Sequence, residues 1–249
     1  MRKFAVIAGS GFAAFGEQST GIEMETEFGR PSSPIRELEY GDPKVLYLAR
    51  HGDQLGIPPH QINYRANLLA LKQLKVDCIV ALNTVGTVDK TQVPGQLAVP
   101  DQIIDYTYGR DHSIYSADSA TLDHIDFTEP FDRELRRSLL RAATEVDAEC
   151  HDRGVYAVMQ GPRLETVAEV NRIERDGATF VGMTAMPEAG LARELGIAYA
   201  CLSLIVNYAA GRGEGTIHED IEGSTLNAKM QAIRVLRAFF QNEAERHGD

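Results

Sequence analysis

The sequence contains little cysteine, with three residues among 249: Cys78, Cys150 and Cys201. Their number is odd, and no two of them stand at the short spacing of a metal-binding pair. The sequence therefore predicts neither a disulfide framework nor a metal site. Buried, reduced thiols suit a reducing compartment, so we predict a cytoplasmic protein.

Long apolar runs are also absent from the sequence. No stretch reaches the roughly 18 to 20 apolar residues that a membrane-spanning helix needs. The apolar stretch near the N-terminus is too short for a secretory signal, because glycine follows it at once. We therefore expect no secretory leader and no association with a membrane.

Positive charge is scarce as well, since 25 Lys and Arg stand against 36 Asp and Glu, giving a formal net charge of −11. A nucleic-acid-binding surface needs clustered positive charge, so we expect no nucleic-acid partner. The same balance still permits one small anion, which a few well-placed donors can bind. With 43% hydrophobic and 24% charged residues, the chain has enough apolar side chains for a folded core.

Short β-rich runs alternate with longer amphipathic stretches, and this alternation predicts the fold class. The predicted strands are Phe4–Ala8, Val45–Ala49, Cys78–Leu82, Gln102–Asp105, Gly154–Met159, Phe180–Met183 and Ala198–Ile205. The predicted helices are Tyr64–Lys75, Phe131–Ala148, Glu165–Asp176, Pro187–Leu195 and Ser224–His247. Most of the strands are apolar throughout, as is typical of strands buried on both faces. We predict a single α/β domain over residues 1–249, with a central mixed β-sheet flanked by helices.

The longest irregular stretch is Tyr108–Pro130, rich in Asp, Ser and His. A loop of that length in a compact domain is usually functional or part of an interface.

The first candidate site is the turn Ala8–Phe12, directly after a predicted strand. Glycine lets backbone N–H groups close around an oxyanion, and Ser10 adds a hydroxyl donor. The spacing of Gly9, Gly11 and Ala14 also satisfies a relaxed dinucleotide-binding pattern. Glycine and proline between residues 16 and 34, however, interrupt the helix and strand that should follow such a pattern. A phosphate loop, a dinucleotide loop and a plain tight turn all stay open from this motif alone.

Two further polar segments follow predicted strands. Arg50 and His51 stand side by side after Val45–Ala49 and suit an anion site at the carboxyl edge of a sheet. A surface ion pair beside a satisfied histidine would give the same pattern. The segment Asn83–Thr87 follows Cys78–Leu82 and either offers backbone N–H groups to a ligand or forms an ordinary turn.

The remaining candidates lie further along the chain. Thr184 precedes a predicted helix, where it would favour phosphate or simply cap the helix. Glu165 opens another predicted helix, where it would bind a ligand or only favour the helix dipole. Asn207 ends an apolar strand and is either a ligand-binding amide or a turn residue.

Together these segments resemble, in their order and in the identity of their residues, the trimeric nucleoside phosphorylases. This family includes purine nucleoside and methylthioadenosine phosphorylases. The resemblance runs from Val6 to about Glu222, and its most characteristic parts are Pro58–Asn67 and Gly182–Glu188. Among the family members, the chain is most similar to the bacterial methylthioinosine phosphorylases. The resemblance implies the nucleoside phosphorylase fold, a homotrimer or a dimer of trimers, and phosphorolysis of a nucleoside with inorganic phosphate as co-substrate and no other cofactor.

Site residues follow from the resemblance, position by position. The phosphate-binding residues it implies are Ser10, Arg50, His51, Thr84 and Thr184. Met183 matches the sugar contact, and the purine contacts fall on Val85, Gly86, Leu164, Glu165 and Asn207.

The catalytic roles that the resemblance implies fall on Asn207, Glu165 and His51. As the glycosidic bond breaks towards an oxocarbenium-like sugar, negative charge arrives on the departing base. Asn207 would donate its amide to the N7 and O6 region of the purine, where that charge gathers. Bound phosphate then attacks the anomeric carbon, without a covalent enzyme intermediate or a metal.

The identity of the base follows from Glu165. A 6-oxopurine carries hydrogen at N1, which an ionised carboxylate accepts, whereas a 6-aminopurine presents a lone pair there. A site built for one pattern can discriminate against the other by as much as roughly 10,000-fold. Adenine-specific relatives carry Asp at the positions of Asn207 and Ala209 and Ser at the position of Glu165. We therefore predict a 6-oxopurine base.

The group at the sugar 5′ position is less well defined by the sequence. Overall similarity favours S-methyl-5′-thioinosine, which would yield hypoxanthine and 5-methylthioribose 1-phosphate. His218 resembles the histidine with which relatives bind a 5′-hydroxyl. This resemblance favours a purine nucleoside phosphorylase that acts on inosine or guanosine. A solvent-facing histidine at the start of a helix would give the same sequence pattern. His124 matches a segment that reaches the 5′ region of a neighbouring subunit in family trimers. Asp53–Leu55 departs from the family at the entrance of the site.

Two other classes of protein stay possible at this point. The Gly9 and Gly11 pattern would suit a nucleotide-binding oxidoreductase, which calorimetry with NAD would test. A purine-binding protein without catalytic activity would bind hypoxanthine and release no base in the presence of phosphate.

Overall fold

The structure is a computed structural model that describes residues 2–9, 12, 20–38, 44–116, 119, 122–214 and 221–247. Its strands are β1 (Phe4–Ala8), β2 (Arg36–Leu38), β3 (Val45–Ala49), β4 (Cys78–Thr87), β5 (Leu97–Val99), β6 (Gln102–Asp105), β7 (Cys150–Asp152), β8 (Val155–Val158), β9 (Phe180–Gly182) and β10 (Ala198–Tyr208). Its helices are the short 3-10 helix η2 (Pro59–Gln61) and α1 (Tyr64–Gln73), α2 (Arg133–Glu145), α3 (Val167–Arg175), α4 (Ala185–Glu194) and α5 (Ile221–His247).

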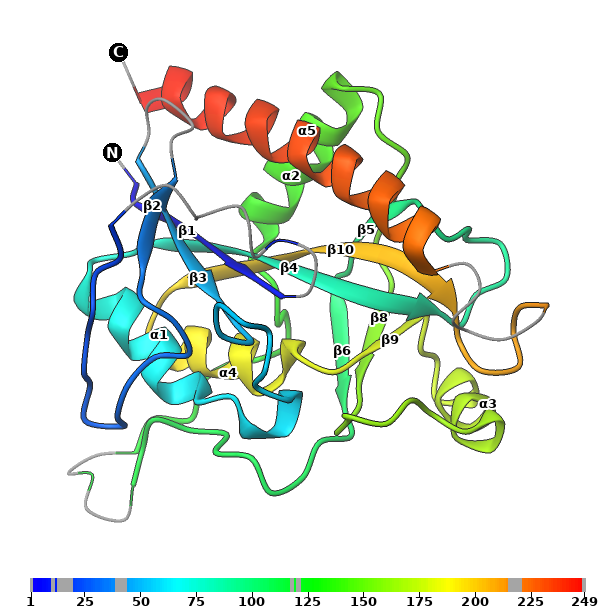
Figure 1. The fold of residues 1–249 in the computed structure, drawn as a ribbon, viewed down its shortest axis with the longest axis horizontal. Coiled ribbons are helices and arrows are strands. Elements are labelled where there is room, and N and C mark those ends of the chain that lie inside the picture. The colour runs from blue at the N-terminus through cyan, green and yellow to red at the C-terminus, as the bar shows by residue number, and fades with distance from the viewer. Residues whose placement is uncertain are drawn as a thin grey trace.

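One mixed sheet forms the centre of the molecule (Figure 1). Its main path runs β2-β3-β1-β4-β10-β5-β7, and β9, β8 and β6 branch from β4. Strands β3, β1, β4 and β10 are mutually parallel, whereas β2, β5 and β9 join this path antiparallel. The prediction of an α/β fold with a mixed sheet flanked by helices is confirmed.

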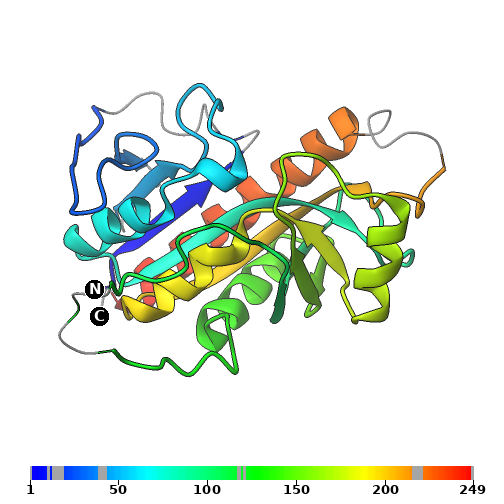
Figure 2. The same cartoon turned by 90° about the horizontal axis from the view of Figure 1, so that it is seen from below.

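Helices cover both faces of the sheet, which explains why its central strands are apolar throughout (Figures 1 and 2). Successive side chains of a strand point to opposite faces. In β1, Phe4 and Val6 pack with α2 and α5, and Ala5 and Ile7 pack on the other face with α1 and α4. Phe4 also meets Phe239 and Phe240 of α5 edge to face. Burial on two faces therefore fixes the position of these strands and of the residues that follow them.

Helix α3 begins later than the sequence predicted. The expected helix Glu165–Asp176 starts instead at Val167, because Thr166 caps it: the Thr166 side chain accepts from the Glu169 backbone, and the Glu169 carboxylate accepts from the Thr166 backbone. Glu165 consequently lies outside the helix, in the segment that leads into it. The dipole explanation for Glu165 therefore does not apply.

Two strands extend beyond their predicted ends. β4 runs to Thr87 and β10 to Tyr208, so the polar residues that the sequence assigned to turns lie within strands. The long parallel pairing between β4 and β10 satisfies the backbone groups that these two strands direct at each other. The sequence also missed β2, β5 and β7, each of which is three residues long.

None of the helices in the described ranges combines the length and the apolar character that crossing a membrane requires.

Candidate active site

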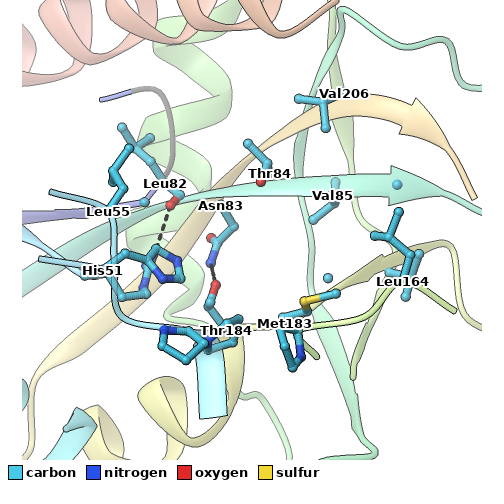
Figure 3. A pocket seen from close by; sticks show the side chains of 18 of the residues that line it. His51, Leu55, Leu82, Asn83, Thr84, Val85, Leu164, Met183, Thr184 and Val206 are labelled. Carbon is cyan, nitrogen blue, oxygen red and sulfur yellow. Dashed lines mark hydrogen bonds between the residues drawn. The ribbon is translucent and has the colours of Figure 1, made fainter. Parts of the chain in front are cut away.

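A pocket of about 440 Å³ opens at the carboxyl ends of the parallel strands (Figure 3). Ligands of open α/β sheets bind at this edge, because the strands deliver their following segments to one place. Seven stretches of the chain line the pocket, and they come from the ends of β1 and β3, from residues 55–59, from β4, from residues 162–165, from residues 181–184 and from β10.

Most of the predicted site residues line this one pocket, although they are far apart in the sequence. They are Arg50, His51, Thr84, Val85, Gly86, Leu164, Glu165, Met183, Thr184 and Asn207. Ser10 and His218 lie outside the described residues. His124 is exposed in the segment before α2 and does not belong to the lining of the pocket in this chain.

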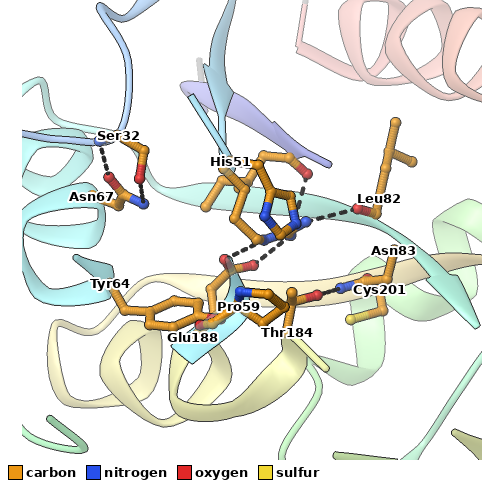
Figure 4. A network of polar contacts seen from close by, with 12 residues as sticks. Ser32, His51, Pro59, Tyr64, Asn67, Leu82, Asn83, Thr184, Glu188 and Cys201 are labelled. Carbon is orange, nitrogen blue, oxygen red and sulfur yellow. Dashed lines mark hydrogen bonds and ion pairs between the residues drawn. The ribbon is translucent and has the colours of Figure 1, made fainter. Parts of the chain in front are cut away.

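Arg50 is buried at one end of the pocket and paired with Glu188 of α4 (Figure 4). Its Nε lies 2.7 Å from one carboxylate oxygen of Glu188 and its Nη2 2.8 Å from the other. Burial alone would lower the pKa of Arg50, but the charge of Glu188 outweighs it and raises that pKa. Arg50 is therefore a permanent cation whose charge Glu188 neutralises, and the expected alternative of a surface ion pair is wrong.

The remaining N–H groups of Arg50 show which part of it can meet a ligand. Nη1 donates to the carbonyl oxygen of Leu82 at 2.9 Å, and Nη2 approaches that of Ile7 at 3.5 Å. A guanidinium has five N–H groups, so one on Nη1 is left without a partner among the residues that the structure describes. Gly9 lies beside it, because a Cβ added at Gly9 would sit 3.4 Å from Nη1. The free donor thus faces the start of the glycine-containing turn.

His51 stands next to this donor with its tautomer set by the backbone. Its Nδ1 lies 2.7 Å from the carbonyl oxygen of Ile57, which can only accept, so Nδ1 carries the hydrogen. Burial lowers the pKa of His51 and favours the neutral ring. Nε2 is then an acceptor, suited to the hydroxyl of a partly protonated phosphate.

Thr184 is oriented by Asn83, a residue of β4 that the sequence did not single out. Asn83 Nδ2 donates to Thr184 Oγ1 at 2.9 Å (Figure 3). Because the hydroxyl oxygen accepts this bond, its own hydrogen stays available to a ligand. Thr184 is the N-cap residue of α4, yet its side chain makes no capping hydrogen bond. A purely capping role therefore does not describe it.

Asn207 reaches the pocket because β10 contains a bulge. The pairing of β10 with β4 shifts register between Ile205 and Asn207, which leaves Val206 as an extra residue. Both Val206 and Asn207 line the pocket as a result. A Cβ added at Gly86 would sit 2.9 Å from Asn207 Nδ2, so glycine at this position gives the amide its space. The same Nδ2 donates to the Tyr208 carbonyl at 2.7 Å, and within the described part of the chain its second hydrogen has no acceptor.

Glu165 and Leu164 lie at the opposite end of the pocket from His51, with Leu164 and His51 on opposite sides of the view in Figure 3. Glu165 is partly buried, and burial raises the pKa of its carboxyl. Leu164 remains 40% exposed, so this end is more open than the Arg50 end.

Several lining residues were not predicted. Leu55 and the segment Gly56–Pro59 close the pocket beside His51. The unusual Asp53 pairs with Arg36, with Nη1 and Nη2 of Arg36 at 2.7 and 2.6 Å from its two carboxylate oxygens, which leaves Leu55 rather than Asp53 at the pocket. Glu188 was identified only as part of a motif, since nothing in a sequence shows that it meets Arg50.

Residues 3–241 match the Phosphorylase superfamily, and the chain belongs to this family of enzymes. It is 49% identical over 214 residues to a probable S-methyl-5′-thioinosine phosphorylase of Xylella fastidiosa, covering 85% of this chain and 86% of that protein. It is 39% identical over 228 residues to the 6-oxopurine nucleoside phosphorylase of Pyrococcus furiosus, covering 89% of this chain and 85% of that protein.

The fold is also that of a solved nucleoside phosphorylase. Methylthioadenosine phosphorylase from Schistosoma mansoni, in complex with tubercidin, matches with a TM-score of 0.90 and 28% sequence identity. The match covers 98% of this chain and 93% of that one. The expected resemblance to nucleoside phosphorylases and the fold it implies are confirmed, and so is the prediction of an enzyme, which as a nucleoside phosphorylase is a pentosyltransferase.

Proposed function

We propose that the protein catalyses the phosphorolysis of 6-oxopurine nucleosides, with S-methyl-5′-thioinosine as the preferred substrate. The observation that carries this proposal is one pocket with a carboxylate and an amide at one end and Arg50, His51 and Thr184 at the other. Relatives named as S-methyl-5′-thioinosine phosphorylases and 6-oxopurine nucleoside phosphorylases support it. The products are then hypoxanthine and 5-methylthioribose 1-phosphate.

Phosphate is assigned to the Arg50 end of the pocket. The free N–H of Arg50, the Thr184 hydroxyl and the backbone at Thr84 donate to its oxygens, and His51 Nε2 accepts from its hydroxyl. Ser10 completes this set in our proposal. Neutralisation of Arg50 by Glu188 means that binding relies on directed hydrogen bonds more than on net charge.

The purine is assigned to the Glu165 end. Glu165 accepts the N1 hydrogen of a 6-oxopurine, and Asn207 donates to the N7 and O6 region as negative charge develops there. Val85, Gly86 and Leu164 contact the ring, and Met183 lies beside the sugar. Attack by phosphate on the anomeric carbon then needs no covalent enzyme intermediate, metal or further cofactor.

The alternative substrate is inosine or guanosine, favoured by His218 in the sequence. His124 would reach the 5′ region of a neighbouring subunit if the protein assembles as a homotrimer or a dimer of trimers. Exposed Tyr108 and Leu122 in the same long segment support an interface there, at 71% and 65% exposure. We propose a cytoplasmic location, which fits the three unpaired cysteines.

Chromatography of the free base tests the proposal directly. Purified protein is incubated with S-methyl-5′-thioinosine, inosine and methylthioadenosine, each with and without inorganic phosphate. We expect phosphate-dependent release of hypoxanthine and a higher kcat/KM for S-methyl-5′-thioinosine than for inosine. Efficient cleavage of methylthioadenosine would contradict the assignment of the base, and no cleavage at all would overturn the proposed function.

A further inference from the structure

Arg110, in the segment after β6, holds together two of the turns that line the pocket. Its Nη1 donates to the carbonyl oxygen of Met183 at 2.9 Å, in the turn between β9 and α4, and to that of Met186 at 2.6 Å, at the kink in the first turn of α4. Its Nη2 donates to the carbonyl oxygen of Gln160 at 2.8 Å, and its Nε approaches the Gln160 side-chain oxygen at 3.2 Å. The first turn contains Met183 and Thr184, and the second leads to Leu164 and Glu165. All four residues line the pocket.

The acceptors around Arg110 are all neutral. Besides these oxygens, Nη1 lies 3.3 Å from the hydroxyl of Tyr64, and the guanidinium carbon lies 5.7 Å from the centre of the Tyr64 ring. Within the described ranges of the chain, no carboxylate forms an ion pair with Arg110. Burial lowers the pKa of Arg110, but a guanidinium stays protonated in proteins. Arg110 is thus a partly buried cation that forms no ion pair among these residues, and the charge of Asp105 acts on it only from a distance.

The other arginines near the pocket are neutralised. Arg50 is paired with Glu188, Arg163 with Glu169, and Arg36 with Asp53. Arg65, which borders the same surface depression as Arg110, lies 2.5 Å from Asp111.

The titratable residues that line the pocket, taken together with Glu188, carry no net positive charge. Arg50 is cancelled by its partner, the neutral form of His51 is favoured, and Glu165 is a carboxyl. An anion that binds there still needs a favourable potential, because its own hydration is lost on binding. Among the described residues, Arg110 offers a positive charge outside any ion pair, one hydrogen bond away from the peptide that joins Met183 to Thr184.

We propose that Arg110 is a positioning residue for the phosphate co-substrate, a role that rests on the proposed function. Arg110 fixes the turn that presents Thr184 and supplies the positive charge that the Arg50–Glu188 pair does not. The carbonyl and the N–H of a trans peptide point in opposite directions. Because Arg110 holds the Met183 oxygen, the N–H of Thr184 in the same peptide points away from the guanidinium, and the orientation of this peptide is fixed.

Calorimetric titration of inorganic phosphate, without nucleoside, tests this role in three variants. Arg110→Met removes the charge and keeps an extended side chain, Arg110→Lys keeps the charge, and Arg65→Met removes a neighbouring charge that Asp111 compensates. We expect Arg110→Met to raise the Kd for phosphate about tenfold or more, since a unit charge at low effective dielectric has an effect of this order. Arg110→Lys should recover most of the loss, and Arg65→Met should stay within about threefold of the unchanged protein.

Steady-state kinetics separate a phosphate effect from a general disturbance of the pocket. In Arg110→Met, the KM for phosphate should rise with the Kd while the KM for nucleoside changes less than about threefold. A folded Arg110→Met with normal phosphate affinity would overturn the proposal. So would an equal rise of both KM values, or an equal loss in Arg65→Met.

Three further outcomes keep the test decisive. If Arg110→Met does not fold, Arg110→Lys decides alone: affinity within about threefold of the unchanged protein supports the role of charge, and a tenfold loss overturns it. If the protein without substitutions binds phosphate but cleaves no nucleoside, the proposed function is overturned. The phosphate titration of the variants then still tests the role of Arg110. An unchanged protein that binds no phosphate would overturn both.

Discussion

The two ends of the pocket are built in different ways. At the Arg50 end, Arg50 and Glu188 are 1% and 0% exposed and belong to the core between the sheet and α4. At the Glu165 end, the residues lie on a loop and on a strand bulge, and Leu164 is 40% exposed. The part assigned to phosphate, which every substrate of such an enzyme shares, is thus fixed by the folded core. The part assigned to the base lies where substitutions disturb the core least.

This contrast predicts that Glu188 matters most for stability. Glu188→Gln would leave the Arg50 charge buried without its partner, so we expect the free energy of unfolding in urea to fall by about 3–5 kcal/mol. The double variant Arg50→Met with Glu188→Leu should recover much of the loss, because no buried charge remains. A loss below about 1 kcal/mol in the single variant would mean that the two ends do not differ in this way.

Asn207 should matter for turnover and little for folding. Asn207→Ala removes a donor aimed at charge that develops on the base, so we expect kcat to fall about 100- to 1,000-fold. The thermal midpoint should stay close to that of the unchanged protein, since the side chain is only partly buried. A nearly normal kcat would remove Asn207 from the mechanism.

Glu165 should control the choice of base and its dependence on pH. A glutamine amide can both donate and accept, so Glu165→Gln should reduce the preference for 6-oxopurine over 6-aminopurine substrates by about 100-fold. Because burial raises the pKa of Glu165, the ionised form is lost at a higher pH than for an ordinary carboxyl. The kcat/KM for S-methyl-5′-thioinosine should therefore fall as pH drops through this raised pKa. A Glu165→Gln profile with the same acid limb would assign that limb to another group.

Gly86 should show the smallest effect of the four. In Gly86→Ala the new Cβ would lie 2.9 Å from Asn207 Nδ2 and 3.3 Å from Val181 Cγ1, so the amide must shift. We expect kcat/KM to fall about tenfold, since displacing a catalytic group by a fraction of an ångström has effects of this order. Gly223→Ala in α5 is the matched control, because its added Cβ would meet nothing within 4 Å. Equal activity in the two variants would show that Asn207 tolerates displacement.

Much of the fold could be predicted because the apolar runs are short and clearly bounded. β1, β3 and β6 have the predicted limits, and they are followed in the sequence by Gly9, Arg50 and Tyr106 respectively. β2, β5 and β7 could not be predicted, since three residues carry too little periodicity to mark a strand. The ends of β4 and β10 were placed too early, because pairing across the sheet satisfies polar residues that a sequence pattern assigns to turns.

The site was predictable to the extent that it depends on the edge of the sheet. Segments that leave parallel strands at one edge meet there, so Arg50 and Thr84 could be expected in one pocket, whereas Thr184 follows β9, which joins β4 antiparallel. The pairing of Arg50 with Glu188 could not, because the two residues are 138 positions apart and no local pattern links them. The bulge at Val206, which brings Asn207 to the pocket, depends on the register of two strands and leaves no mark in the sequence.

The reciprocal hydrogen bonds between Thr166 and Glu169 have a consequence for how such a protein can change over time. They fix the start of α3 within the helix and its cap, and Arg163 joins them through its ion pair with Glu169. Leu164 and Glu165, whose side chains take no part in this cap, can then be exchanged while the helix keeps its start. A lineage could in this way acquire a new preference for the base without rebuilding its scaffold.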